Sequence, residues 1–164
     1  MAVSEREGGC ACGAVRYRIE GDPIFVNNCH CRQCQQQTGS TSVVNAFFES
    51  DRITLLSGEL AEHVATAGSG GPHIICRCSE CGTALWSYYP GLGRIGAGLR
   101  VGTLDDSADM RPDAVVWVAE RMPWVALPEG IPHFEAYYDF RELLAPEKIQ
   151  RMDALIERRM AGEG

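Results

Sequence analysis

The eight cysteines of this chain lie in three tight clusters, and this grouping limits the possible folds more than any other feature of the sequence. The clusters are Cys10 and Cys12, then Cys29, Cys31 and Cys34, and finally Cys76, Cys78 and Cys81. Thiols that are one or two residues apart pair with each other only with strain, because a disulfide needs a particular spacing of its Cα atoms. In a reducing compartment such clusters are more often metal ligands than disulfides. The sequence therefore predicts a fold built around metal sites.

The middle cluster, Cys29-His30-Cys31-Arg32-Gln33-Cys34, places three thiols in a segment short enough for them to bind one ion. Zinc binds thiolate sulfur at about 2.3 Å and prefers four ligands in a tetrahedron, so this cluster leaves one position open. The Cys10/Cys12 and Cys78/Cys81 pairs supply two ligands each, and together they would form a closed site that ties the first strand to the middle of the sheet. This arithmetic favours two zinc ions, one in a structural four-thiolate site and one in an open three-thiolate site.

The eighth thiol, Cys76, has no place in this count. Alternation along a strand puts Cys76 and Cys78 on the same side, so Cys76 could close the triplet as its fourth ligand or displace a neighbour in the structural site. Free cysteine is also a common buried residue, and this is the interpretation that we favour.

Length and charge argue against several classes of function. The 164 residues are enough for a substantial core, and we expect residues 1–164 to form a single domain. The net charge of −7 and the lack of any lysine- or arginine-rich run argue against binding to nucleic acid or to an anionic membrane. The N-terminal residues contain no apolar signal segment, and no stretch is long enough to span a bilayer. We therefore expect a cytoplasmic protein.

Alternating and β-branched segments predict a mainly β fold, with strands at residues 15–19, 24–26, 42–48, 53–56, 74–76, 85–89 and 115–118. A short helix is expected over residues 31–37, ended at Gly39, because this stretch is polar and rich in helix formers. Residues 91–96 match the dinucleotide fingerprint, but an alternating stretch follows instead of a helix, so we predict a glycine-rich hairpin. An amphipathic helix over residues 146–160 is expected to pack against the domain or a dimer partner.

Three motifs follow one another along the chain, and their order is specific. They are Gly8-Gly9-Cys10-x-Cys12-Gly13, then Cys29-His30-Cys31-x-x-Cys34 with Thr38-Gly39-Ser40, and then Cys78-x-x-Cys81-Gly82-Thr83. Together with the stretches at residues 102–106 and 124–134, they resemble the glutathione-dependent formaldehyde-activating enzyme family. The similarity covers about residues 8–135.

The resemblance implies a zinc-bound β-tent fold with a core over about residues 8–135 and a C-terminal helical extension over about residues 146–160. It also implies two zinc ions and no other cofactor. The structural zinc would be held by Cys10, Cys12, Cys78 and Cys81, and the catalytic zinc by Cys29, Cys31 and Cys34.

The activity implied by the resemblance is that of a carbon–sulfur lyase, in which formaldehyde or another small aldehyde adds to glutathione or a related thiol. The product of the founding reaction is S-hydroxymethylglutathione, so the expected partner is a small thiol. The alternative hypothesis is a non-catalytic zinc module with both metal sites closed, used for protein–protein interaction. A homodimer is compatible with either hypothesis.

The remaining candidate residues have weaker signals. His30 lies between two expected ligands and is interpreted as a neighbour of the metal or a solvated side chain, whereas His63, His73 and His133 are expected to be surface or hydrogen-bonded residues. Arg32 and Arg77 could pair with a glutathione carboxylate. The sequence identifies no general acid or base.

Overall fold

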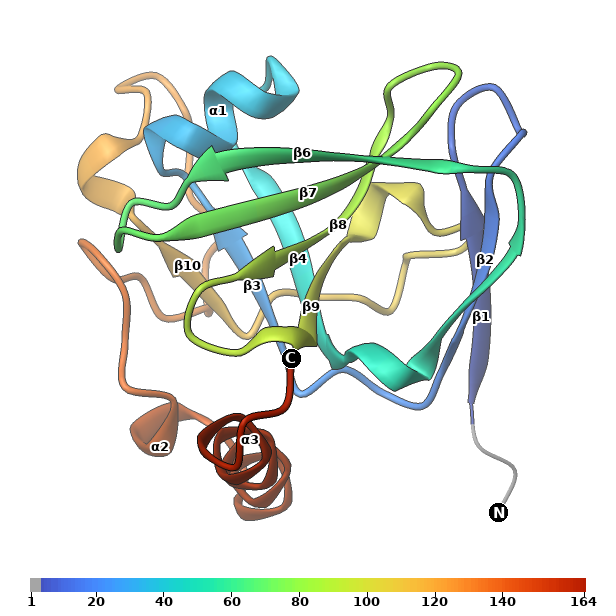
Figure 1. Cartoon of the computed structure of the whole chain (residues 1–164). Coiled ribbons are helices and arrows are strands. Elements are labelled where there is room, and N and C mark those ends of the chain that lie inside the picture. Colours follow the sequence, from blue (N-terminus) through green and yellow to red (C-terminus); the bar gives the residue numbers. More distant parts are fainter. Residues whose placement is uncertain (1–3) are drawn as a thin grey trace.

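The computed structural model describes residues 4–164, so the first three residues of the N-terminal stretch lie outside the described part. Its strands form two sheets (Figure 1). The small sheet has the order β1-β2-β5, with β1 at Glu5–Gly9, β2 at Arg16–Glu20 and β5 at Ile53–Ser57. The prediction of a mainly β fold is confirmed.

The large sheet has seven strands in the order β10-β3-β4-β9-β8-β7-β6. All neighbours are antiparallel except β10 and β3, which are parallel. The strands are β3 (Phe25–Cys29), β4 (Val43–Glu49), β6 (Leu60–Thr66), β7 (Pro72–Cys78), β8 (Ala84–Tyr89), β9 (Gly93–Arg100) and β10 (Ala114–Val116).

Within residues 4–164, three α-helices and three short 3-10 helices accompany the sheets. They are α1 (Arg32–Thr38), α2 (Phe140–Leu143) and α3 (Pro146–Met160), with η1 (Ser50–Arg52), η2 (Val101–Thr103) and η3 (Val118–Glu120). The predicted helix after the cysteine triplet is confirmed, and it ends where Gly39 adopts a left-handed conformation with φ of 65°. None of the described helices has the length and apolar character needed to cross a membrane.

Two other predictions meet different outcomes. The glycine-rich stretch at residues 91–96 leads into β9 and not into a helix, as predicted. The strand expected over residues 115–118 is shorter, because Trp117 adopts a left-handed φ of 58° and ends β10, and η3 begins at Val118. A tryptophan rarely adopts this conformation, so no local pattern of residues signals the break.

The two faces of the large sheet have different partners, because successive side chains of a strand point to opposite faces. One face supplies Ala46, Phe48 and Leu99 to the main core, which also contains Tyr17 and Ile19 of the small sheet. The other face is apolar near α3, where Phe25 and Phe47 stack with their ring centroids 4.9 Å apart. Toward α1 the same face becomes polar. The fold therefore reserves one end of one sheet face for polar groups.

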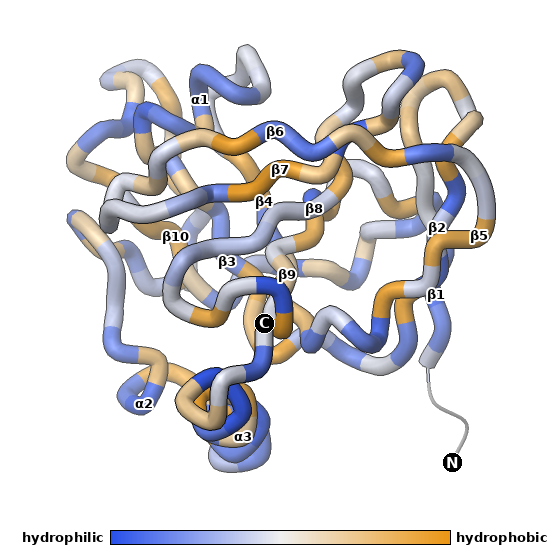
Figure 2. The backbone as a smooth tube through the Cα atoms, in the orientation of Figure 1, coloured by the Kyte–Doolittle hydropathy of each residue, from blue (hydrophilic) through white to orange (hydrophobic). Residues whose placement is uncertain are grey.

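Helix α3 covers the apolar end of that face (Figure 2). Its buried residues are Met152 and Leu155, and they pack in a cluster with Ile24 and Ile95. The amphipathic helix predicted from the sequence is thus confirmed, and it packs against its own chain. Of the two partners expected for it, the domain and a dimer partner, the described contacts provide the first.

Leu155→Ala should lower the free energy of unfolding by about 2–5 kcal/mol, because the side chain is 1% exposed and its removal leaves a cavity between helix and sheet. Urea denaturation followed by circular dichroism measures this change. Met160→Ala is the matched control, since Met160 lies at the end of the same helix but is 83% exposed. Equal effects of the two substitutions would contradict the packing of α3 against the sheet.

Candidate metal centre and active site

The first cysteine cluster joins the two sheets. Cys10 and Cys12 lie in the turn between β1 and β2, whereas Cys78 ends β7 and Cys81 lies in the turn that follows. All four sulfurs lie within 4.8 Å of one another. A tetrahedron with metal–sulfur bonds of about 2.3 Å separates its sulfurs by about 3.8 Å. The four-thiol cluster therefore fits a tetrahedral ion. The sequence-based picture of a first strand tied to the middle of one sheet was wrong, because the cluster links a second, smaller sheet to β7.

Hydrogen bonds around this four-thiol cluster favour the charged form of Cys10 and Cys81, whereas hydrogen bonds with the other thiols raise the pKa of Cys12 to about 12. The backbone N–H of Val15 donates to Cys10 Sγ at 3.2 Å. The Thr83 hydroxyl lies 3.1 Å from Cys81 Sγ, and this hydrogen bond lowers the pKa of Cys81 to about 5. A thiol that ionises near neutral pH is a ready metal ligand.

The triplet forms the second cluster. Cys29 is the last residue of β3, Cys31 is the N-cap of α1, and Cys34 lies in the first turn of that helix. The backbone N–H of Cys34 donates to Cys31 Sγ at 3.4 Å, so the helix start itself holds one sulfur in place. The three sulfurs lie within 4.8 Å of one another, so they can occupy three corners of a zinc tetrahedron.

The two clusters differ in their number of possible ligands. Among residues 4–164, no fourth histidine, cysteine or acidic side chain places a ligand atom within the same 4.8 Å of all three triplet sulfurs. The triplet is also the more buried of the two clusters, since Cys12 and Cys81 of the four-thiol cluster are exposed. An ion held by the triplet would retain one position for a small ligand.

Hydrogen bonds within the triplet divide its charge unevenly. The thiols of Cys29 and Cys34 lower the pKa of Cys31, which carries a negative charge most readily. The same hydrogen bonds, together with burial, raise the pKa of Cys29. The cluster without a metal therefore favours one thiolate and two thiols.

A buried arginine lies beside the triplet. Arg100 is 5% exposed. A hydrogen bond to Cys29 and, more weakly, the charge of Arg100 act to lower the pKa of Cys34, but Cys31 and burial outweigh them and raise it to about 11. The Arg100 guanidinium donates to Asn45 Oδ1, to Gln37 Oε1 at 3.0 Å and to Ser87 Oγ at 3.3 Å. All three acceptors are neutral, and no carboxylate in the described part of the chain forms a salt bridge with Arg100. Its positive charge is therefore available to the sulfurs.

A groove of about 650 Å³ runs from the four-thiol cluster to Arg100. Its lining includes Cys81 and Arg77 together with Gln37 and Arg100. It also includes five hydroxyl side chains, from Thr38, Ser42, Thr83, Thr103 and Ser107. Two arginines and several hydroxyls suit a small ligand that carries carboxylates.

The arginines and histidines that the sequence offered as candidates differ in where they lie in the structure. Arg77 lines the groove, but Arg32 does not, and its side chain is exposed. His30 is 1% exposed, so the solvated alternative was wrong for this residue. His63 and His133 are exposed, and His73 is 1% exposed with its Nδ1 atom hydrogen-bonded to Gln37, so each fits the expectation of a surface or hydrogen-bonded residue. Sequence reasoning missed Arg100 and gave no special weight to His73, since a single residue in a strand carries no motif.

Cys76 lies apart from both clusters. It is 1% exposed, and it packs in the main core on the sheet face opposite to the polar one. Burial, with a further contribution from Glu62, raises the pKa of Cys76 to about 11, which disfavours the thiolate that a metal requires. Its position agrees with the interpretation of Cys76 as a buried residue outside the metal sites.

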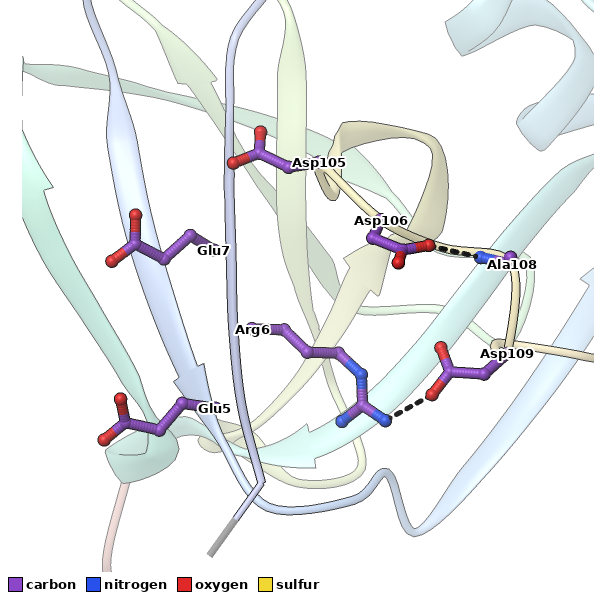
Figure 3. A pocket seen from close by; sticks show the side chains of 7 residues that line it. All are labelled: Glu5, Arg6, Glu7, Asp105, Asp106, Ala108 and Asp109. Atoms are coloured by element: carbon purple, nitrogen blue, oxygen red, sulfur yellow. Dashed lines mark hydrogen bonds and ion pairs between the residues drawn. The ribbon is translucent and has the colours of Figure 1, made fainter.

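A second hollow, of about 430 Å³, lies between β1 and the loop after η2 (Figure 3). Its charged lining residues are Glu5, Arg6, Glu7, Asp105, Asp106 and Asp109. Arg6 points across the hollow to Asp109 and forms an ion pair with it at 2.6 Å. None of the lining residues belongs to a cysteine cluster, so this hollow is separate from both candidate metal sites.

Comparisons with known proteins agree with the cysteine pattern. The family model described as "Glutathione-dependent formaldehyde-activating enzyme" matches residues 5–120. A Halomonas elongata protein, provisionally named as a glutathione-dependent formaldehyde-activating enzyme, is 32% identical over 91 residues. The match covers 51% of this chain and 56% of that protein. The crystal structure of a Rhodobacter sphaeroides protein is similar with a TM-score of 0.47 and 15% identity, over 78% of this chain and 98% of that one.

Cys76→Ala should retain the full metal content of the wild-type protein, because Cys76 Sγ belongs to neither sulfur cluster. Metal analysis of the purified variant by mass spectrometry is the measurement. Cys34→Ser, which removes one triplet sulfur and is expected to keep the fold, is the control that should lose metal. Loss of one metal equivalent from the Cys76 variant would show that Cys76 is a ligand.

Proposed function

Because the chain belongs to the glutathione-dependent formaldehyde-activating enzyme family, we propose that it adds glutathione or a related small thiol to formaldehyde or another small aldehyde. In this carbon–sulfur lyase type of reaction the thiol loses its proton, its sulfur bonds to the carbonyl carbon, and the carbonyl oxygen gains a proton. The observation that carries the proposal is the three-sulfur cluster without a fourth protein ligand in residues 4–164.

In the proposed function, Cys29, Cys31 and Cys34 hold a catalytic zinc ion. Bound there, zinc would supply a positive charge that favours the thiolate form of the substrate and polarises the aldehyde oxygen. The contribution of the chain is to hold the three sulfurs from two elements, the end of β3 and the start of α1. Burial of the triplet excludes water and strengthens the electrostatic interactions in the site.

The groove supports glutathione as the thiol. Glutathione carries two carboxylates, and arginine is the side chain best suited to bind a carboxylate through two parallel hydrogen bonds. Arg77 lines the groove, and it donates one hydrogen bond to Gly82 O at 2.9 Å and keeps its other N–H groups available. A carboxylate bound by Arg77 would leave the rest of the peptide to extend along the hydroxyl-lined groove toward Arg100.

The four-thiol cluster has a structural role in this proposal. Cys10, Cys12, Cys78 and Cys81 offer a full set of four ligands from two sheets, so a zinc ion there stabilises the arrangement of the sheets. The free energy of binding that zinc ion would contribute to folding, because the two pairs of sulfurs are far apart in the unfolded chain.

Cobalt-substituted protein tests whether the triplet is open. Glutathione should change the visible spectrum of a tetrahedral cobalt site, and Arg77→Ala should weaken the response to glutathione about tenfold, in line with the loss of one charge-assisted hydrogen bond. Arg111→Ala is the control, because Arg111 is exposed and lies outside the groove. Formation of S-hydroxymethylglutathione from glutathione and formaldehyde, followed by NMR, then measures the activity itself. Two cobalt sites that respond to no small thiol would support the closed, non-catalytic zinc module instead.

The two clusters should respond differently to loss of one ligand. Cys81→Ser should leave the protein insoluble or unfolded, because a structural zinc site contributes on the order of 10 kcal/mol to folding in small domains. Cys34→Ser should keep the fold, since the triplet lies within one short segment of the chain, but it should bind less metal and no thiol. Far-UV circular dichroism and zinc content of both variants are the measurements. Complete unfolding of the Cys34 variant would assign the triplet a structural role and remove the main support for an open site.

A further inference from the structure

Several buried polar side-chain atoms in the described residues lack a hydrogen-bond partner, among them both ring nitrogens of His30, Arg100 Nε and one ring nitrogen of His73. The His73 nitrogen is the one whose protonation state follows from its neighbours. His73, near the start of β7, is 1% exposed, and its Nε2 atom has no hydrogen-bond partner among the described residues. The imidazole stacks on Tyr89 at the end of β8, with ring centroids 4.4 Å apart and planes inclined by 18°. Tyr89 therefore holds the plane of the imidazole by stacking, without a hydrogen bond to either ring nitrogen. A buried polar atom without a partner is costly, and such atoms are often found where a ligand binds.

A chain of hydrogen bonds determines which nitrogen of His73 carries the proton. Arg100 can only donate, so the Gln37 side-chain amide must turn its oxygen toward the guanidinium, 3.0 Å away. The amide nitrogen of Gln37 then faces His73 Nδ1 at 3.3 Å and donates to it. Nδ1 is thus an acceptor, and in the neutral ring the proton resides on Nε2. The unpartnered Nε2 atom of His73 is therefore a hydrogen-bond donor.

His73 is connected to the triplet through helix α1, which carries both Cys34 and Gln37. Gln37 lies three residues after Cys34 in α1, so the two side chains share one face of the helix. The side chain of Gln33 in the same helix donates to Thr66 O at 2.6 Å, at the end of β6 next to the β6–β7 turn that leads to His73. Gln37 and Arg100 also line the groove, so a ligand in the groove reaches the residues that position His73.

The imidazole is neutral at physiological pH. Burial lowers the pKa of His73 to about 4, and the charge of Arg100 acts in the same direction, against a smaller opposing effect of Cys31. A neutral imidazole can donate a hydrogen bond to an oxygen on which negative charge develops, without first losing or gaining a proton.

We propose that His73 Nε2–H donates a hydrogen bond to the carbonyl oxygen of the aldehyde as the thiol sulfur adds to the carbon. This role rests on the proposed function. In the step, the thiol releases its proton to water, the carbon–sulfur bond forms, and the carbonyl π electrons move to oxygen. The resulting alkoxide takes a proton from water to become the hydroxyl of the product, and the proton released by the thiol neutralises the hydroxide that this leaves. His73 keeps its proton throughout, and it stabilises the charge that the oxygen carries before the proton from water arrives. Gln37 is the positioning residue, because it keeps Nδ1 as the acceptor.

The tautomer can be tested without any activity. In zinc-loaded protein labelled with 15N, the His73 ring should show a proton on Nε2 and none on Nδ1 at pH 7. Glutathione added together with formaldehyde should shift the Nε2 proton signal, and glutathione alone should leave it unchanged. A proton on Nδ1, an unchanged signal with both reagents, or scalar coupling between Nε2 and 113Cd in cadmium-loaded protein would overturn the proposal. The last result would make His73 the fourth ligand of the triplet.

Substitution of His73 tests the same donor through the reaction. His73→Phe retains a ring that stacks on Tyr89 but has no donor, and it should lower kcat about 100-fold, the usual effect of losing one such donor. His73→Gln places an amide N–H near the position of Nε2 and should recover part of that loss. His63→Phe, on the neighbouring strand β6, is the control, since His63 is exposed.

The outcomes separate this proposal from the proposed function. Wild-type protein that forms no adduct from glutathione and formaldehyde would contradict the proposed function, whatever the state of His73, and the NMR result would then decide on the donor alone. Active wild-type protein with an equally active His73→Phe variant would leave the proposed function intact and overturn the role of His73.

Discussion

Four sulfurs from two different sheets meet within 4.8 Å, and the arrangement of the molecule depends on this contact. Four thiolates at such distances would repel one another, and a cation bound between them would hold the β1–β2 turn against the end of β7. The small sheet then reaches the other cluster through a short series of hydrogen bonds. Tyr17 Oη lies 2.7 Å from Thr103 Oγ1, which donates to the backbone oxygen of Arg100 at 2.7 Å. Gly8 is required there, because a Cβ atom would lie 2.4 Å from Thr103 O.

Strand alternation allows one large sheet to serve both folding and chemistry. In β4, Ala46 and Phe48 face the main core, whereas Asn45 faces Arg100 on the neighbouring strand β9. In β9, Leu99 belongs to the core and Arg100 to the polar network. A shift of register by one residue would exchange these sets, so the apolar face that stabilises the sheet also fixes the positions of the polar groups.

The sequence predicted the features that depend on local spacing. The cysteine clusters, the helix after the triplet and the amphipathic C-terminal helix are each visible within a short window. It could not predict His73, Gln37 and Arg100 as a network, because they lie on β7, α1 and β9 and meet only through strand pairing. Alternation suggested that residues near Arg100 form a strand, but not that this charged side chain is buried beside sulfurs. The division into two sheets was missed for the same reason.

Both clusters offer cysteine sulfur as the ligand, but burial and nearby charge differ between them and would give a bound ion a different net charge. The four-thiol cluster is partly exposed, so water can compensate for the net charge of −2 that four thiolates and one divalent cation would carry. At the triplet, three thiolates and one divalent cation would carry −1, and the buried Arg100 offsets this charge. In the proposed function, a substrate thiolate would then enter a site that is close to neutral instead of one with a net charge of −1. The absence of a carboxylate partner for Arg100 in residues 4–164 is what leaves its charge for this purpose.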